Sequence, residues 1–141
     1  MAFAQAFLAF DWGKLRVGVA SGNTVTGTAQ GVATLTQQGL AREQAITKLV
    51  KEWRPSALVC GVPYHPDGVP HKNTTVAKQF AQSLRDLTGL PVYEVDERYS
   101  TTEVRADNRA HTKSSANRLE AKLDALSACV ILEQYMRSLP Q

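Results

Sequence analysis

The order of strand-like and helix-like segments limits the possible folds of this chain more than any single motif does. Three strand-like segments come first, at residues 7–11, 16–21 and 28–35, and short turns containing Gly or Asn separate them. Turns of this length join antiparallel strands. From Leu40 onward helix-like and strand-like segments alternate, and this alternation adds parallel strands to a sheet. The sequence therefore predicts an α/β fold with a mixed five-stranded sheet, in which the first three strands are antiparallel.

The later elements follow from the spacing of apolar residues and from the residues that end helices. Residues 57–62 form an unbroken apolar run, which is typical of a strand covered on both faces. Right-handed crossovers would place this strand and the strand at 92–97 beside the first one, in the order 3-2-1-4-5. The C-terminal ends of strands one, four and five then lie together. Helices are predicted at 40–53, from a cap at Asn73 or Thr74 to Gly89, at 100–110 and at 117–137, and the polar residues 111–116 are expected to be mobile.

Size and composition restrict the class of protein. A chain of 141 residues can bury a core of its own, so we expect one domain over residues 1–141. Its apolar stretches are too short to span a bilayer, and residues 1–6 lack the basic start of a secretory signal. Cys60 and Cys129 both lie inside apolar segments and indicate neither a disulfide framework nor a metal site. We therefore expect a cytoplasmic protein.

The positive charge of the chain is concentrated in one segment. The formal net charge is +3. Residues 98–122 carry six basic and three acidic side chains, so the whole excess lies there and the rest of the chain is neutral. Such a segment suits contact with a phosphate backbone. A solvated helix surface with ion pairs between successive turns explains the same pattern.

Carboxylates stand at positions where an apolar environment makes them costly. Asp11 ends the first strand, Asp96 and Glu97 end the last one, and Asp124 lies in a helical segment that is apolar nearly all round. Desolvating a carboxylate is unfavourable unless it is paired. Successive strand residues point to opposite faces of a sheet, so only one of Asp96 and Glu97 can face Asp11. The predicted strand order would bring these acids together.

Converging carboxylates repel one another unless a cation lies between them. Mg²⁺ and Mn²⁺ prefer such oxygen ligands, and two of these ions about 4 Å apart can activate water for cleavage of a phosphodiester. Each acid also has a plainer explanation. Asp11 can be a turn residue before a hairpin, Asp96 and Glu97 can end a strand in a simple turn, and Asp124 can pair with Arg98 or Lys122.

Four blocks of the sequence share a pattern with a known family. The first is Asp11-Trp12-Gly13 with residues 16–20, and the second is Gly61-Val62-Pro63 with Asp67-Gly68. The third is residues 96–101, and the fourth is residues 124–128 with Ile131-Leu132. In this order they resemble the YqgF/RuvX family of RuvC-like nucleases. Tyr99 departs from the family pattern, which has Leu at this position, and the loop after Pro63 is richer in Pro and His than usual, but neither departure removes a carboxylate.

The resemblance implies an RNase H-like fold and a catalytic triad of Asp11, Glu97 and Asp124, with Asp96 as the alternative middle acid. It implies that these acids bind Mg²⁺ or Mn²⁺ as two ions, with Asp11 shared between them. Basic residues near the acids or in the positive segment are the candidates for contact with nucleic acid: Lys14, Arg16, Arg98, Arg105, Arg109 and Lys113.

The resemblance also implies a substrate. The family is associated with processing of the 5′ end of pre-16S rRNA in ribosome biogenesis, and alternatively with resolving Holliday junctions in DNA. A third reading is a non-catalytic RNA-binding factor for ribosome assembly. A nucleotide-binding fold of the actin and sugar-kinase type would need a second domain to enclose ATP. Nothing in the sequence indicates a dimer, so a monomer or weak homodimer is expected.

Overall fold

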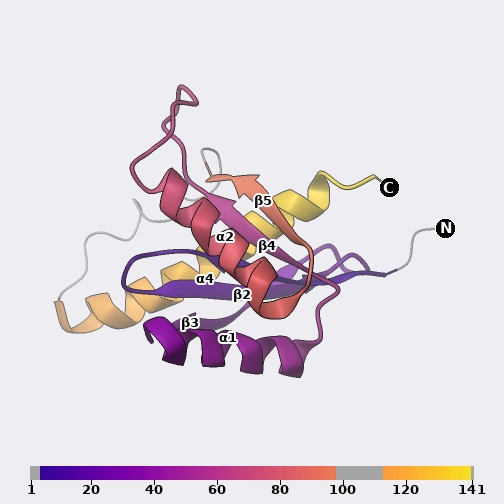
Figure 1. Cartoon of the computed structure of the whole chain (residues 1–141), viewed down its shortest axis with the longest axis horizontal. Helices are drawn as coiled ribbons and strands as arrows, with labels where there is room; N and C mark the ends of the chain where they lie inside the picture. The colour runs from indigo at the N-terminus through magenta and orange to yellow at the C-terminus, as the bar shows by residue number, and fades with distance from the viewer. Residues whose placement is uncertain (1–3, 98–112, 141) are drawn as a thin grey trace.

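The structure is a computed structural model that describes residues 4–97 and 113–140 (Figure 1). Between Lys113 and Lys122 it describes the backbone alone. The elements within these ranges are, in chain order, β1 (Ala6–Asp11), β2 (Val17–Asn23), β3 (Ala29–Leu35), α1 (Gly39–Trp53), β4 (Ala57–Val62), α2 (Thr74–Thr88), β5 (Val92–Asp96) and α4 (Lys113–Arg137).

The five strands form one mixed sheet in the order β3-β2-β1-β4-β5. β1 is antiparallel to β2, and β2 is antiparallel to β3. β4 runs parallel to β1 on its other side, and β5 runs parallel to β4. The predicted strand order and the predicted directions are confirmed. The C-terminal ends of β1, β4 and β5 consequently lie at the same end of the sheet.

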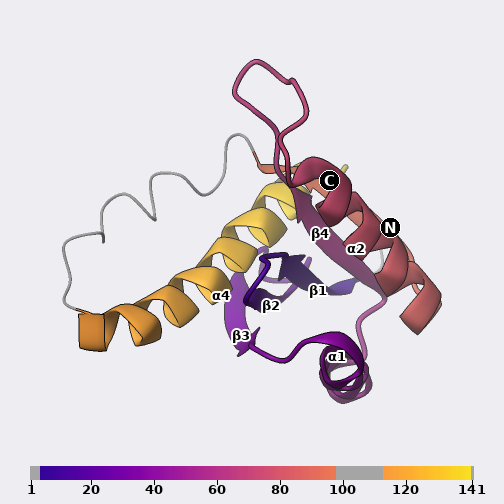
Figure 2. The same ribbon diagram turned by 60° about the vertical axis from the view of Figure 1, so that its left-hand side comes forward.

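Helices cover both faces of the sheet, with α1 and α2 on one face and α4 on the other (Figure 2). Alternating residues of β1 serve the two faces. Leu8 and Phe10 pack in the core under α1 and α2, whereas Phe7 and Ala9 pack in the core under α4. Because side chains alternate along a strand, Asp11 continues the series that faces α4. The last residue of β1 thus points toward the helix that carries Asp124.

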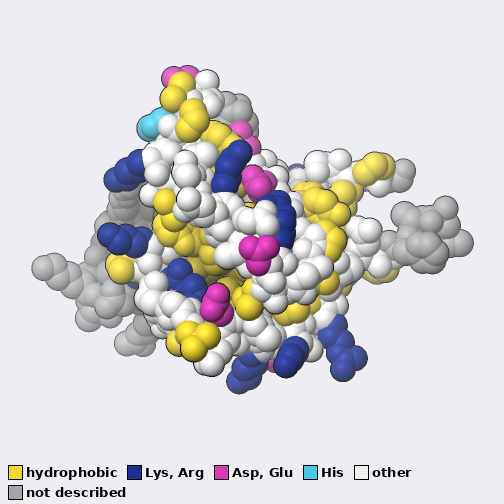
Figure 3. All heavy atoms as spheres, in the orientation of Figure 1, with side chains coloured by type: hydrophobic (Ala, Val, Ile, Leu, Met, Phe, Trp, Pro, Cys, Tyr) yellow, Lys and Arg dark blue, Asp and Glu magenta, His cyan; other side chains and the backbone are white. Residues whose placement is uncertain are grey.

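The face formed by α1 and α2 carries interspersed Lys, Arg, Asp and Glu side chains around apolar ones (Figure 3). A hollow of about 260 Å³ lies between these two helices. Its walls include Leu40 and Leu87, which are both exposed. The mixture of charge signs gives this face no continuous basic surface in the visible, described part of the chain.

Two glycines allow α4 to approach the sheet closely. A Cβ atom on Gly18 of β2 would lie 2.0 Å from the backbone oxygen of Asp124, so the helix backbone rests directly on the strand there. A Cβ on Gly31 of β3 would lie 3.1 Å from the Cβ of Ala125, a much milder contact. The contact at Gly18 sets the position of α4 at the residue that carries the predicted acid.

The structure corrects one boundary and leaves one predicted element outside its range. The last helix begins at Lys113, so the predicted start at residue 117 was wrong by four residues. Extending an existing helix costs little compared with nucleating one, and the apolar part of α4 packed on the sheet supplies the nucleus. The helix predicted at 100–110 lies outside the described residues. Among the described helices, none is long and apolar enough to cross a bilayer.

Candidate active site

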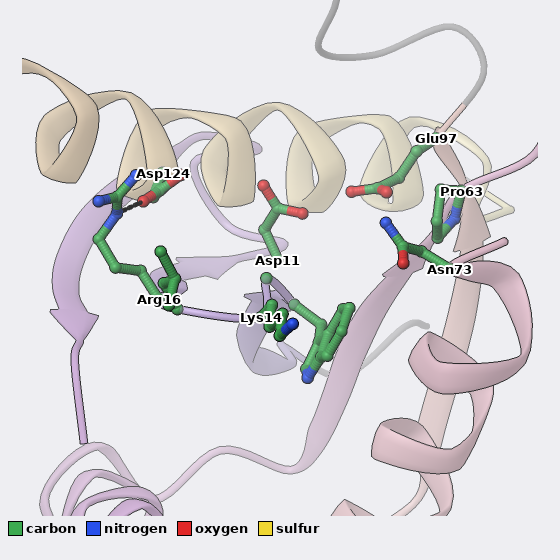
Figure 4. Close-up of a pocket in the computed structure, with 10 residues that line it drawn as sticks. Asp11, Lys14, Arg16, Pro63, Asn73, Glu97 and Asp124 are labelled. Atoms are coloured by element: carbon green, nitrogen blue, oxygen red, sulfur yellow. Dashed lines mark hydrogen bonds and ion pairs between the residues drawn. The ribbon is translucent and has the colours of Figure 1, made fainter. Parts of the chain in front are cut away.

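A cavity of about 390 Å³ opens at the C-terminal end of β1 (Figure 4). Its wall is made by the end of β1, the loop 12–16, Pro63 after β4, Asn73 before α2, Glu97 after β5 and Asp124 of α4. These segments are distant in sequence and meet because the ends of β1, β4 and β5 coincide. The three acids predicted to form a triad therefore line the same cavity.

Two of the three acids are buried. Asp11 is 7% exposed and Asp124 is 8% exposed. Glu97 is partly buried, and its side chain lies over the backbone of Gly61, where a Cβ atom would be only 2.6 Å from Oε1. The absence of a side chain at Gly61 thus provides the space that the carboxylate of Glu97 occupies.

The alternation of β5 distinguishes Glu97 from Asp96. Val95 packs in the core under α4, whereas Val92 packs in the core under α2. Residues two apart in a strand lie on the same face, so Glu97 shares the face of Val95, which is also the face of Asp11 and Asp124. Asp96 lies on the opposite face. Glu97 lines the cavity, and Asp96 is not one of its lining residues.

Asp124 forms an ion pair with Arg16 across the cavity. Nε of Arg16 donates a hydrogen bond of 2.7 Å to Oδ2 of Asp124. The two side chains are 25% and 12% exposed, so water reaches both. A salt bridge was one sequence-based explanation of Asp124. The structure shows one, but its partner is Arg16; Arg98 and the side chain of Lys122 lie outside the described residues.

The acids are arranged in a row. Figure 4 shows Asp11 between Glu97 on one side and Asp124 on the other. Among the residues that the structure describes, no three His, Cys, Asp or Glu side chains are grouped around a single point suitable for one metal ion. Carboxylate oxygens are the hard donors that Mg²⁺ and Mn²⁺ prefer, so Asp11, Glu97 and Asp124 are the residues of the cavity that could hold such ions.

The acids also affect a neighbouring thiol. Burial raises the pKa of Cys60 in β4, and the negative charges of Glu97 and Asp11 raise that pKa further. The thiol is therefore protonated at neutral pH.

The predicted basic contacts divide into two groups. Lys14 and Arg16 line the cavity from the loop between β1 and β2. Arg98, Arg105 and Arg109 lie outside the described residues, as does the side chain of Lys113, whose backbone begins α4. The structure thus brings two of the six predicted basic residues to the acids.

The sequence did not indicate the part played by two polar residues, one that lines the cavity and one that holds its loop. Asn73 directly precedes α2, but its side chain makes no capping hydrogen bond and lines the cavity. Nε2 of Gln38, next to α1, donates to the carbonyl oxygens of Lys14 and Leu15 at 3.2 Å each and fastens the loop. No sequence signal could have identified Gln38, because its partners lie 24 and 23 residues away.

Comparison of the sequence with known proteins finds one family model and several similar proteins. A family model described as "RuvX: Holliday junction resolvase" matches residues 5–138. A protein of Polaromonas sp. (strain JS666) named "Putative pre-16S rRNA nuclease" is 52% identical over 136 residues, which cover 96% of this chain and 91% of that protein. A protein of the same name from Paraburkholderia phymatum is 44% identical and covers 94% of this chain and 85% of its own length.

Solved structures share the fold. RuvC of T. thermophilus in complex with a Holliday junction substrate has a TM-score of 0.55 and a sequence identity of 11% to this chain. The match covers 95% of this chain and 94% of the RuvC chain. A second Thermus thermophilus RuvC structure has a TM-score of 0.53 at 10% identity and covers 94% of this chain and 95% of its own. At this identity the likeness concerns the fold alone, and it confirms the RNase H-like class.

Proposed function

The chain belongs to the RuvX family, and from this membership together with its cavity we infer that it is a nuclease that hydrolyses phosphodiester bonds. The observation that carries the inference is the row of carboxylates from Glu97, Asp11 and Asp124 along one cavity. Lys14 and Arg16 supply positive charge at the same place. This combination suits a substrate that is anionic and a reaction that needs divalent cations.

In the proposed mechanism each residue of the cavity has a separate task. Asp11 would hold both ions, and Glu97 and Asp124 would hold one each. Bound there, Mg²⁺ or Mn²⁺ would supply the activation of a water molecule and the stabilisation of the leaving oxygen. Lys14 attracts the phosphate beside the cut, and the side-chain amide of Asn73 can donate a hydrogen bond to it. The protein otherwise supplies position and charge.

We favour pre-16S rRNA as the substrate, so that the protein would act in ribosome biogenesis. The curated relatives carry that name and match this chain over most of their length. The alternative is a four-way DNA junction, which the family description and the fold of RuvC favour. Symmetric cutting of a junction needs two active sites related by a dimer axis, and the sequence does not indicate a dimer. We therefore propose a monomer or weak homodimer that acts on RNA in the cytoplasm.

The test is a cleavage assay on two substrates side by side. Purified protein is incubated with RNA spanning the 5′ end of pre-16S rRNA and with a synthetic four-way junction, in Mn²⁺, Mg²⁺ or EDTA. We expect metal-dependent cuts at defined positions in the RNA and none in EDTA. Paired symmetric cuts in the junction alone would make DNA the substrate. Binding of RNA without cleavage in either metal would favour the non-catalytic assembly factor.

A pair of substitutions identifies the middle acid. We expect Glu97→Gln to lower the cleavage rate by about ten- to a hundredfold, which is the loss usually seen when a group that supports a metal ligand is removed. Asp96→Asn should lower it less than about threefold, because β5 turns that side chain away from the cavity. The same assay at saturating Mn²⁺ measures both variants. A larger loss of cleavage rate in Asp96→Asn than in Glu97→Gln would make Asp96, and not Glu97, the middle acid.

A further inference from the structure

We propose that Arg16 occupies Asp124 in the metal-free protein, and that a metal ion takes its place and thereby delivers the Arg16 guanidinium to the phosphate of the substrate. The proposal rests on the metal site of the proposed function and adds an exchange of partners to it. Arg16 would be a positioning residue before the ion binds and a phosphate-binding residue afterwards. One side chain would thus couple metal loading to substrate binding.

The ion pair is suited to exchange because it holds an oxygen that the ion would need and because water reaches it. Nε of Arg16 lies 2.7 Å from Oδ2 of Asp124, so the guanidinium holds an oxygen that the ion would need. The side chains are 25% and 12% exposed, which lets a hydrated ion reach them. A carboxylate as buried as that of Asp124 is costly to leave without a cationic partner. In the exchange it keeps one, because the ion takes the place of the guanidinium.

The backbones on both sides of the ion pair are held in place. The loop before Arg16 is fastened by the hydrogen bonds from Gln38 to the carbonyls of Lys14 and Leu15. The backbone of Asp124 rests on Gly18, where not even a Cβ atom would fit. Neither α4 nor the strand needs to move for the exchange. Rotation of the two side chains is sufficient.

Electrostatics gives the exchange a direction. Among the described residues that line the cavity, three acids face only two basic side chains, Lys14 and Arg16. An ion between Asp11 and Asp124 gains attraction from both carboxylates and repels the nearby guanidinium. A guanidinium released from a carboxylate has the planar geometry to bind a phosphate through two hydrogen bonds. By linkage, metal and nucleic acid should each strengthen the binding of the other.

The test measures Mn²⁺ binding by isothermal titration calorimetry without nucleic acid, which needs no catalysis. We expect Arg16→Gln to bind Mn²⁺ about three- to tenfold more tightly than the original chain, because the competing cation is gone; tenfold corresponds to about 1.4 kcal/mol. Lys14→Gln is the matched control, since it removes the same charge from the same cavity without removing the ion pair. Its effect should be smaller. Circular dichroism and thermal melting confirm that each variant is folded.

A second measurement follows the released side chain. In Mn²⁺, Arg16→Gln should bind the RNA substrate about threefold more weakly, whereas in EDTA the two proteins should bind it alike. Arg16→Lys keeps the charge and serves if Arg16→Gln does not fold; it should bind Mn²⁺ with an affinity between the other two. Weaker Mn²⁺ binding by Arg16→Gln would show that Arg16 only orients Asp124 and would overturn the exchange. If the original chain and Asp124→Asn bind Mn²⁺ equally poorly, the metal site itself is wrong.

Discussion

Asp11→Asn should abolish cleavage while leaving the protein folded and able to bind nucleic acid. Asn has nearly the shape of Asp but no charge, and Asp11 is the central acid of the row and 7% exposed. Losing the shared ligand weakens both proposed ion sites at once. We expect the cleavage rate to fall by at least about a hundredfold, because even groups that only support a metal ligand cost ~10–100-fold when removed. RNA binding should be unchanged or stronger, because repulsion of the phosphate decreases.

The measurement combines single-turnover cleavage in Mn²⁺ with RNA binding in EDTA. Asp86→Asn is the matched control, because it removes the same charge from an exposed position of α2. It should change neither quantity by more than about twofold, as is usual for exposed positions. Normal processing of precursor RNA by Asp11→Asn would exclude the nuclease hypothesis and leave the RNA-binding factor as the better account.

Gly18→Ala should lower the stability of the protein and disturb the position of Asp124. The added Cβ would lie 2.0 Å from the backbone oxygen of Asp124 and 2.3 Å from its carbonyl carbon, so the helix has to move away from β2. Backbone atoms cannot rotate aside as a flexible side chain can. We expect the free energy of unfolding to fall by about 3 kcal/mol, the upper end of the usual cost of overpacking. Displacing Asp124 should also weaken Mn²⁺ binding.

The control is Gly31→Ala on the neighbouring strand, which faces the same helix one residue further on. The nearest atom to its Cβ would be the Cβ of Ala125, at 3.1 Å, and the backbone of Ala125 would come no closer than 3.9 Å. We expect a loss of less than about 1 kcal/mol in denaturant unfolding and Mn²⁺ affinity close to that of the original chain. Equal stability losses in the two variants would mean that α4 adjusts freely and is not positioned by Gly18.

The sheet could be predicted because its rules are local and topological. The turns before residue 35 require antiparallel strands, and the right-handed crossover rule leaves one position for each of β4 and β5. Side-chain alternation then determines which face Asp11 and Glu97 share. The convergence of three acids on one cavity follows from these rules together with the packing of α4.

The ion pair and the fastening of the loop could not be predicted in the same way. Arg16 and Asp124 are 108 residues apart, and many basic side chains could have reached the acid. The choice depends on where α4 rests on β2, which is set by the contact at Gly18 rather than by any pattern of charge. Gln38 and Asn73 are ordinary polar residues in the sequence. Only the three-dimensional arrangement brings Asn73 to the cavity and Gln38 to the loop that borders it.

The alternation along β1 separates two kinds of genetic change that sequence comparison often treats alike. Every residue from Phe7 to Phe10 serves one of two cores, so many apolar replacements of suitable volume can be accommodated there. A deletion or insertion of one residue in that strand would instead turn Asp11 toward α1 and α2. Selection on this strand should therefore tolerate exchange of its side chains and strictly preserve its length. The number of residues in β1 is as much a part of the site as the carboxylate itself.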